Sequence, residues 1–468
     1  MNFNSFDFLF FLFAFMCIWP AARHTPRSRW WVLTVSSFVF YGWWDWRFCF
    51  LLATNGLIDF VAAQRIVDRP AQRRGWLVAS IAANLGTLAF FKYLNFGLAQ
   101  LDTVLAVFGV QPLPVLHVIL PVGISFYTFQ SMSYTIDVYR GSLRPTRNLA
   151  HFFAYLAMFP QLVAGPIVRA SDLLPQLENP GKFDAVARLD GLSLIAFGMF
   201  KKVVIADNVA LAVNAAFDHH DAGAGALFWW VASGLFGIQI YCDFSGYSDI
   251  AIGIARWMGY RFPENFRHPY TAHGFRDFWG RWHISLSTWF RDYLYIPLGG
   301  NRVSPTRQHV NLWITMLVSG VWHGANWTFL VWGAIHAAYL SLERVTRWPS
   351  RLSAIPGGRA LGILATYLLT IPAWTYFRAE TVGQANAIVG TMATGSATSI
   401  PLSAILTPSA AFWGVAFLVY EAHHAIWPDR GAPFAKSHPS IRAPALALVL
   451  IACVLLRGPG GQFIYFQF

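Results

Sequence analysis

The chain has 468 residues, of which 56% are hydrophobic and only 12% are charged, and its formal net charge is +12. Soluble domains carry about twice that share of charged residues, so the composition excludes an ordinary soluble protein. The basic residues stand in short clusters between long apolar runs, which is typical of the loops of a membrane protein and not of a nucleic-acid-binding surface. We therefore expect an all-α polytopic protein in the lipid bilayer, with no nucleic-acid partner.

Apolar runs of the length that crosses a bilayer, about 20 residues, recur along the whole chain. They lie near residues 6–21, 30–45, 47–63, 76–97, 114–132, 149–166, 189–216, 225–254, 309–342, 358–377, 409–427 and 441–457. These runs predict about eleven transmembrane helices. The first has no basic segment before it and no small-residue cleavage site after it, so we interpret it as a retained helix rather than a signal peptide.

Three basic clusters set the orientation of the first spans. They are Arg23, Arg27 and Arg29; Arg65, Arg69, Arg73 and Arg74; and Arg140, Arg144 and Arg147. Because positively charged loops resist translocation, we predict that all three connections are cytoplasmic. The N-terminus then lies outside.

Residues 255–308 are too rich in charge to be a span. Within 275–293, Arg276, Trp279, His283 and Ser287 recur at steps of three and four residues, which predicts one face of a single helix. A helix with basic and aromatic faces lies at the membrane interface or partly enters the bundle. His283 is a candidate for chemistry, and the alternative is that it only packs beside Trp279.

The strongest candidate for chemistry is His323, in the segment 321–326 (VWHGAN). No charged residue occurs between Val310 and Leu342, and a continuous helix of that length would be roughly 50 Å long, against a hydrocarbon core of about 30 Å. The helix is therefore strongly tilted or broken near Gly320 and Gly324. A polar group at mid-run faces the bundle interior or water, and flanking glycines allow a substrate or another backbone to come close.

Other histidines and carboxylates in apolar runs have competing interpretations. His323 itself can be a structural histidine hydrogen-bonded between helices. His336 lies about 140° further round a continuous helix, so we interpret it as structural. Asp243 and Asp249 either pair with arginines from 256–302 or orient a histidine, and we favour pairing.

Several common classes of site have no support in the sequence. The four cysteines are scattered and show no CxxC or Cys/His spacing, so we expect no metal centre and no disulfide framework. There is no GxxxxGK[ST] phosphate loop and no GxSxG elbow. A transporter would show polar residues in both halves of the chain, whereas here they concentrate between about 241 and 336. This asymmetry favours one reaction site in one scaffold.

An ordered set of short motifs resembles one family along most of the chain. The matching segments are 120–127 (LPVGISFY), 136–141 (IDVYRG), 163–167 (VAGPI), 243–249 (DFSGYSD), 281–287 (RWHISLS), 298–302 (LGGNR), 322–326 (WHGAN) and 463–468 (FIYFQF). The chain resembles the membrane-bound O-acyltransferase superfamily, in its bacterial branch that includes the membrane subunit for alginate O-acetylation.

The resemblance implies a fold and a reaction. The fold is a single membrane domain over 1–468, with N-terminal spans in 1–240, a catalytic core in 241–342 and C-terminal spans in 343–468, and with interfacial or re-entrant helices around a central tunnel. The invariant histidine of the family falls on His323 and its second implicated histidine on His283. The donor is acetyl-CoA, used as a substrate from the cytoplasm, with no bound cofactor. Partner proteins in the periplasm complete transfer to the polymer, which places the chain in a bacterial inner membrane.

The chemistry fits these residues. A neutral imidazole can take the proton of an attacking hydroxyl, and burial keeps an imidazole neutral. His283, Asn326 or a backbone amide can steady the developing oxyanion. Trp322 and Asp243 are supporting candidates, and Arg291 and Arg302 are candidates for holding the CoA phosphates.

The sequence therefore predicts O-acetylation of an exported, alginate-like polysaccharide. Cellulose, peptidoglycan and teichoic acid stay open as acceptors. A non-enzymatic transporter of polysaccharide or lipid-linked sugar is the alternative from another class.

Overall fold

The computed structural model describes residues 1–109, 111, 116, 118–181, 184–218, 224–395, 400–427, 434, 437–461 and 463–464. These residues form helices joined by short connections, and no strand occurs among them. They divide into two compact units. The N-terminal unit holds residues 1–192 and 251–263, and the C-terminal unit holds 193–250 and 264–468. The division of a single domain at residues 240 and 342 stays a prediction.

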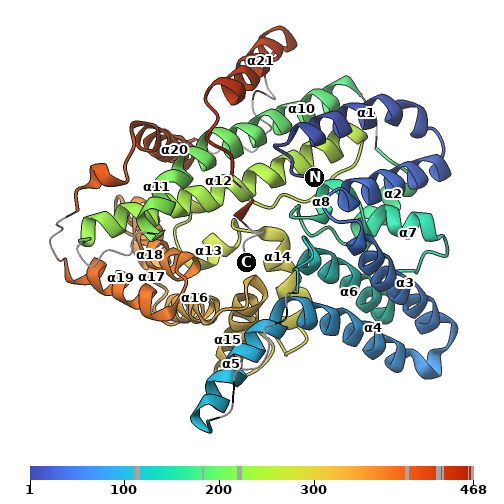
Figure 1. Cartoon of the computed structure of the whole chain (residues 1–468), viewed down its shortest axis with the longest axis horizontal. Coiled ribbons are helices and arrows are strands. Elements are labelled where there is room, and N and C mark those ends of the chain that lie inside the picture. Colours follow the sequence, from blue (N-terminus) through green and yellow to red (C-terminus); the bar gives the residue numbers. More distant parts are fainter. Residues whose placement is uncertain are drawn as a thin grey trace. The chain divides into compact units, whose positions relative to one another are not determined.

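The N-terminal unit contains the helices up to Glu178 and parts of two later helices (Figure 1). Its helices are α1 (Phe6–Ala22), α2 (Pro26–Gly42), α3 (Arg47–Asp68), α4 (Arg73–Leu88), α5 (Leu94–Val107), α6 (Ile124–Arg140), α7 (Leu149–Leu156), α8 (Phe159–Leu162), α9 (Ala170–Glu178) and the beginning of α10 (Ala185–Met199). The end of α12 (Ala226–Met258) also belongs to this unit.

The C-terminal unit holds most of α12 and the remaining helices. They are α11 (Asp207–Asp218), α13 (Phe275–Trp279), α14 (Ile284–Phe290), α15 (Pro305–His323), α16 (Trp327–Thr346), α17 (Trp348–Ser353), α18 (Gly358–Arg378), α19 (Val382–Thr394), α20 (Pro408–Ile426) and α21 (Pro439–Leu455). A π-helical segment, η3 (Phe200–Ala206), joins α10 to α11.

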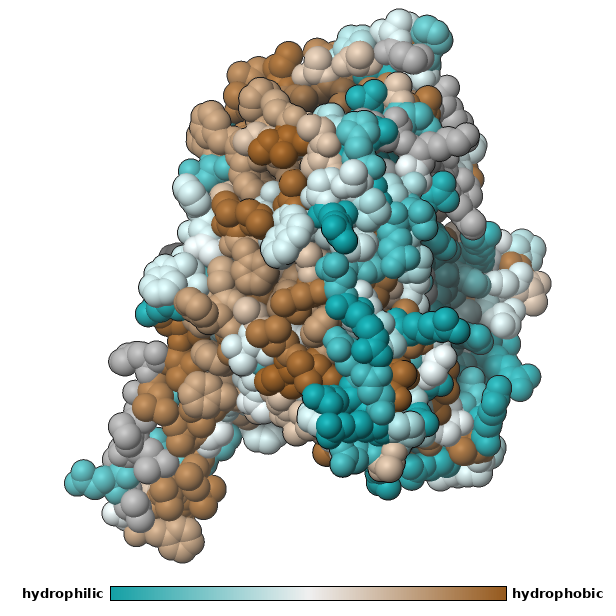
Figure 2. Space-filling view, turned by 90° about the vertical axis from the view of Figure 1, so that its right-hand side faces the viewer, coloured by the Kyte–Doolittle hydropathy of each residue, from teal (hydrophilic) through white to brown (hydrophobic). Residues whose placement is uncertain are grey.

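Several helices are long and apolar enough to cross a membrane. Among the described residues they are Arg47–Asp68, Pro70–Val107, Ala226–Met258 and Gly358–Arg378, and two shorter apolar helices cover Phe6–Ala22 and Ser440–Leu455. Large apolar side chains also cover broad areas of the surface (Figure 2), where lipid is the solvent that accommodates them. The prediction of an all-α, multi-pass membrane protein is confirmed, and the total of about eleven spans stays a prediction.

The predicted span at 149–166 is not one helix. It consists of α7 and the four-residue α8, with Met158 between them at ψ 111°. Pro160, in the first turn of α8, has no amide hydrogen, and in a continuous helix its ring would clash with the carbonyl group of the residue four positions earlier. The run is apolar because the N-terminal unit buries it, as the exposed fractions of 0% for Phe152 and Phe159 show.

The three basic connections of the N-terminal unit lie together. Arg147 forms an ion pair with Asp68 at 2.6 Å, which joins the α6–α7 connection to the end of α3. Arg73 donates to the carbonyl oxygen of Tyr139 and lies 4.3 Å from the centre of its ring. Arg27 and Arg147 line one cavity. These contacts agree with the three connections lying on one side of the membrane. The prediction that this side is cytoplasmic rests on their positive charge.

The long apolar run around His323 is broken into a hairpin. α15 and α16 lie side by side and antiparallel (Figure 1), since His309 and Trp313 near the start of α15 both contact the hydroxyl of Ser341 near the end of α16. The break follows His323 directly, because Gly324 has an extended backbone and α16 begins at Trp327. The sequence-based prediction of a break near Gly320 and Gly324 is therefore confirmed.

Candidate active site

His323 is the last residue of α15, so it lies at the tip of the hairpin. Its side chain is buried in aromatic rings, with centroid distances of 5.0 Å to Trp322, 5.0 Å to Trp332 of α16 and 5.2 Å to Phe377 of α18. These rings exclude water from the imidazole without offering it a charge.

Two glycines allow the hairpin to close around His323. A Cβ atom on Gly320 would lie 2.3 Å from the carbonyl oxygen of Phe329, and one on Gly324 would lie 2.0 Å from Cε2 of the Phe329 ring. No side chain fits at either distance. Gly320 admits the backbone of α16, which agrees with the expected close approach of another backbone, whereas Gly324 admits the ring of Phe329.

His336 lies nearer to His323 than the sequence indicated. The angle of about 140° assumed a continuous helix, and the break at Gly324 removes that assumption. Both histidines pack against Trp332, at centroid distances of 5.0 Å for His323 and 4.8 Å for His336. The angle of about 140° therefore does not describe how the two side chains lie, and the structural role of His336 stays a prediction.

His283 begins α14 and is completely buried. Its backbone is in the left-handed region, with φ 42° and ψ 54°, a conformation that costs about 1 kcal/mol for a residue with a side chain. This turn separates α13 from α14, so Arg276, Trp279, His283 and Ser287 do not lie on one helix face as predicted. The turn points the imidazole into the C-terminal unit, where its ring lies 4.6 Å from that of Phe244.

Asn265 holds His283 in place, and no motif or spacing in the sequence indicated this residue. Its Oδ1 atom lies 3.1 Å from Nδ1 of His283 and accepts hydrogen bonds from the amide and the hydroxyl of Ser285 at 3.3 and 2.8 Å. Its amide nitrogen donates to the hydroxyl of Ser248 at 3.0 Å. Because a backbone amide can only donate, the oxygen of Asn265 is correctly placed as the acceptor. Nδ1 of His283 therefore carries the proton, and Nε2 carries the lone pair.

Burial lowers the pKa of His283 to about 3, because desolvation penalises the imidazolium form. The ring is neutral throughout the physiological pH range. A base with so low a pKa holds a proton poorly at pH 7. His283 is therefore suited to orient a group through hydrogen bonds and not to store a proton.

One indole contacts both candidate histidines. The Trp322 ring centroid lies 6.1 Å from that of His283 and 5.0 Å from that of His323. The C-terminal unit thus brings together residues 40 positions apart in the chain, from the start of α14 and the end of α15. Two buried imidazoles beside one tryptophan can bind and orient a hydroxyl and a carbonyl out of contact with water.

The carboxylates of α12 pair with lysines and not with the arginines of 256–302. Asp243 lies 2.7 Å from Nζ of Lys202, and its second oxygen accepts from the amide of Ile464 at 2.7 Å. Asp249 lies 2.7 Å from Nζ of Lys201. Both carboxylates do form ion pairs, but the predicted partners in 256–302 are wrong, because the cations are two lysines of η3 that stand among apolar residues with no pairing signal in the sequence. Asp243 thus connects the backbone at Ile464 to α12 and η3.

Asn326 is a helix cap. Its Oδ1 accepts from the amide of Thr328 at 3.0 Å, and its Nδ2 donates to the carbonyl oxygen of Glu380 at 2.8 Å. One N–H of the amide is used in this way and, among the described residues, the second is not, so the role of Asn326 in steadying an oxyanion stays a prediction. Asn326 starts α16 and positions the hairpin tip.

The two predicted phosphate-binding arginines lie outside the aromatic cluster. Arg291 pairs with Asp292 at 2.6 Å and keeps 58% of its side chain exposed. Arg302 is exposed in the connection before α15. Both are accessible to an anionic ligand.

Comparison with known proteins points to one family. Residues 142–380 match the family model described as membrane-bound O-acyltransferase. The chain is 41% identical to the probable alginate O-acetylase AlgI of Pseudomonas putida over 405 residues, which cover 84% of this chain and 80% of that protein. It is 42% identical over 390 residues to the protein of the same name from Pseudomonas aeruginosa, covering 81% and 72%. It is 36% identical over 381 residues to the peptidoglycan O-acetyltransferase of Helicobacter pylori, covering 75% and 71%.

Proposed function

Since this chain belongs to the membrane-bound O-acyltransferase family and is a multi-pass membrane O-acyltransferase, we propose that it transfers an acetyl group from acetyl-CoA to hydroxyl groups of an exported, alginate-like polysaccharide. The observation that carries the proposal is the cluster of His283, Trp322 and His323. The names of the two Pseudomonas relatives support alginate as the class of acceptor.

His323 accepts the proton in this proposal. The acceptor oxygen attacks the thioester carbonyl carbon while the imidazole takes the hydroxyl proton. The C–S bond then breaks, and the same proton passes to the departing thiolate, so the products are an acetyl ester and free CoA. General base catalysis of this kind contributes about 10²–10⁴-fold to the rate. The aromatic rings around His323 exclude water, which would otherwise hydrolyse the thioester.

His283 positions the reacting groups. Its Nδ1 proton is directed to Asn265, so Nε2 is the atom that can accept a hydrogen bond from a second hydroxyl group of the sugar, because the proton of the attacking hydroxyl goes to His323. Because its pKa is about 3, it leaves the proton to His323. Arg291 and Arg302, exposed in neighbouring connections, meet the CoA phosphates.

The positive charges of the N-terminal unit support the proposed orientation in the membrane. The three basic connections are on the cytoplasmic side of a bacterial inner membrane, and the N-terminus is periplasmic. Acetyl groups reach the polymer in the periplasm with the help of partner proteins of the export system.

The decisive experiment compares substitutions of His323 and His336, two buried histidines that both contact Trp332. His323→Ala in nanodiscs should lower acetyl transfer from labelled acetyl-CoA to alginate oligosaccharides by at least 10²-fold, with expression and thermal unfolding close to wild type. His336→Phe is the matched control, because it keeps a buried ring in the same cluster, and it should retain transfer. Full transfer by the His323 variant would overturn the assignment, and sugar flux across liposomes without any acetylation would favour a transporter.

Peptidoglycan is the second candidate acceptor, because the Helicobacter relative carries that name. The same assay with alginate oligosaccharides and peptidoglycan fragments as competing acceptors distinguishes the two. Label found only in peptidoglycan would move the proposal to that polymer.

A further inference from the structure

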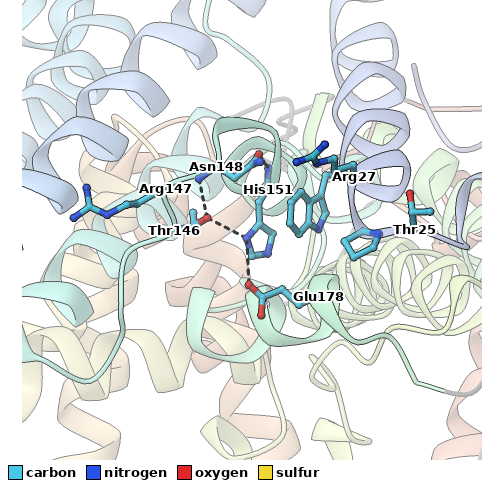
Figure 3. Close-up of a pocket in the computed structure, with 9 residues that line it drawn as sticks. Thr25, Arg27, Thr146, Arg147, Asn148, His151 and Glu178 are labelled. Carbon is cyan, nitrogen blue, oxygen red and sulfur yellow. Dashed lines mark hydrogen bonds and ion pairs between the residues drawn. The ribbon is translucent and has the colours of Figure 1, made fainter.

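A cavity of about 760 Å³ opens on the basic side of the N-terminal unit, among residues that the proposed reaction does not use. It is lined by the ends of the α1–α2 and α6–α7 connections and by α9, with Arg27, Trp30, Arg147, His151 and Glu178 among its wall residues (Figure 3). The volume is in the range of cavities that hold small-molecule ligands.

The histidine in the wall is satisfied in its neutral form. Nε2 of His151 lies 3.1 Å from the carbonyl oxygen of Leu174, so this nitrogen donates. Nδ1 lies 3.1 Å from the hydroxyl of Thr146, which accepts from the amide of Asn148 and can give its own proton to Nδ1. The ring also stacks on Trp30 at a centroid distance of 4.4 Å. A neutral His151 supplies no positive charge to the cavity.

Two opposite charges in the wall consequently lack a counter-charge. The carboxylate of Glu178 is 57% exposed and lies 3.9 Å from Nδ1 of the neutral His151. The guanidinium of Arg29 donates to the backbone carbonyl oxygen of Glu178, and within the described residues it forms no ion pair with the carboxylate. Arg27 is exposed, and its guanidinium has no hydrogen-bond or ion-pair partner within the described part of the chain. Arg147 is turned away toward Asp68. Figure 3 shows Arg27 and Glu178 apart from each other, with His151 between them in this view.

A ligand that carries both charges matches this wall. A phosphate can accept hydrogen bonds from the fork of the Arg27 guanidinium. An ammonium group can pair with the carboxylate of Glu178. A purely anionic ligand would instead meet the carboxylate of Glu178, which repels it.

The surface of α2 indicates that this ligand comes from the membrane. Beyond Arg27, the exposed side chains at successive steps of four residues are Trp31, Val35 and Val39, with exposed fractions of 60%, 55% and 49%. Residues four apart are neighbours on a helix surface. A chain that leaves the cavity beside Arg27 can therefore follow an apolar stripe along α2.

We propose that this cavity binds the headgroup of a zwitterionic phospholipid, with phosphatidylethanolamine as the lipid, from the leaflet that faces the basic connections. The phosphate binds Arg27, the ammonium group binds Glu178, and an acyl chain lies along Trp31, Val35 and Val39. The lipid fixes the ends of α2, α7 and α9 to one another.

The test measures lipid retention, so it is independent of acetyl transfer. The full chain is purified in nanodiscs of mixed phosphatidylethanolamine and phosphatidylglycerol, and the lipid that stays bound after transfer to detergent is identified by native mass spectrometry. Wild type should retain phosphatidylethanolamine. Arg27→Gln should lower its retention about tenfold, the equivalent of one charge-assisted contact. Glu178→Gln should lower it similarly and raise retention of phosphatidylglycerol.

Arg74→Gln is the matched control, because Arg74 is an exposed arginine of the same basic side outside the cavity, and its lipid retention should equal wild type. Thermal unfolding confirms that each variant is folded. Preferential retention of phosphatidylglycerol by wild type would refute binding of a zwitterionic headgroup. Equal retention of phosphatidylethanolamine by all three variants would refute binding at Arg27 and Glu178. Binding of soluble glycerophosphoethanolamine as strong as that of the lipid would overturn the membrane source.

Discussion

Asn265 should control both the stability of the C-terminal unit and the protonation of His283. Its side chain is 1% exposed, and its oxygen accepts from His283 and twice from Ser285. In Asn265→Ala the hydroxyl of Ser285 can turn elsewhere, but the imidazole and amide N–H groups lose their acceptor. At about 1–3 kcal/mol for each buried donor left unsatisfied, the expected loss of unfolding free energy is about 3 kcal/mol.

Asn265→Asp separates positioning from stability. A carboxylate keeps the acceptor for all three donors, so most of the stability should return. The new negative charge lies beside His283 and raises its pKa from about 3, because an opposite charge favours the imidazolium form. As the pH falls, the Asp variant should therefore lose acetyl transfer at a higher pH than wild type.

The assay is acetyl transfer from labelled acetyl-CoA between pH 4.5 and 8, together with thermal unfolding in the same detergent. Asn311→Ala is the control, because Asn311 is also a fully buried asparagine, and it bonds to the carbonyl oxygens of Leu298 and Gly300 instead. This control should lose stability with an unchanged pH profile. If Asn265→Asp and wild type have the same acidic limb, Asn265 does not set the protonation of His283, and the reasoning fails.

Three further predictions concern the supports of the site. In Gly324→Ala the new Cβ would lie 2.0 Å from the Phe329 ring, so the ring must move at an expected loss of about 1–3 kcal/mol; an unchanged melting temperature would contradict this. Lys202→Met leaves two buried carboxylates without their cation and should lower the unfolding free energy by about 3–5 kcal/mol, with partial recovery on adding Asp243→Asn in chemical denaturation. Because burial lowers the pKa of His283 in the folded state, the same imidazole is protonated at a higher pH in the unfolded chain. Acidification from pH 6.5 to 5 should therefore lower the unfolding free energy by up to about 1.4 kcal/mol per pH unit. His283→Gln should remove this contribution to the pH dependence of stability.

The sequence predicted the features that depend on local composition. Helical apolar runs, the basic connections and the break after His323 all follow from which residues are adjacent in the chain. Gly324 is a good example, because a run too long for one span with glycines at its middle must bend somewhere. The structure adds the direction of the bend, which carries α16 back along α15.

The features that the sequence missed depend on residues far apart in the chain. Asn265 gives no periodic or spacing signal, and only the fold brings it to His283. Lys202 lies in an apolar segment 41 positions before Asp243, so its pairing with that carboxylate could not be read from either segment. The left-handed turn at His283 also explains why the prediction of one helix face was wrong, because a pattern of three- and four-residue steps assumes an uninterrupted helix.

His283 and His323 have different surroundings, and this difference is the reason for the different roles that we propose for them. His283 is fixed by an amide oxygen that sets its tautomer, and its low pKa makes an imidazolium at that position costly. His323 is the last residue of α15 and packs against aromatic rings of three helices, α15, α16 and α18. A reaction that moves one proton needs one residue to hold the geometry and another to carry the charge for a moment. In the proposed reaction His283 has the first task, and His323, which contacts the same indole, has the second.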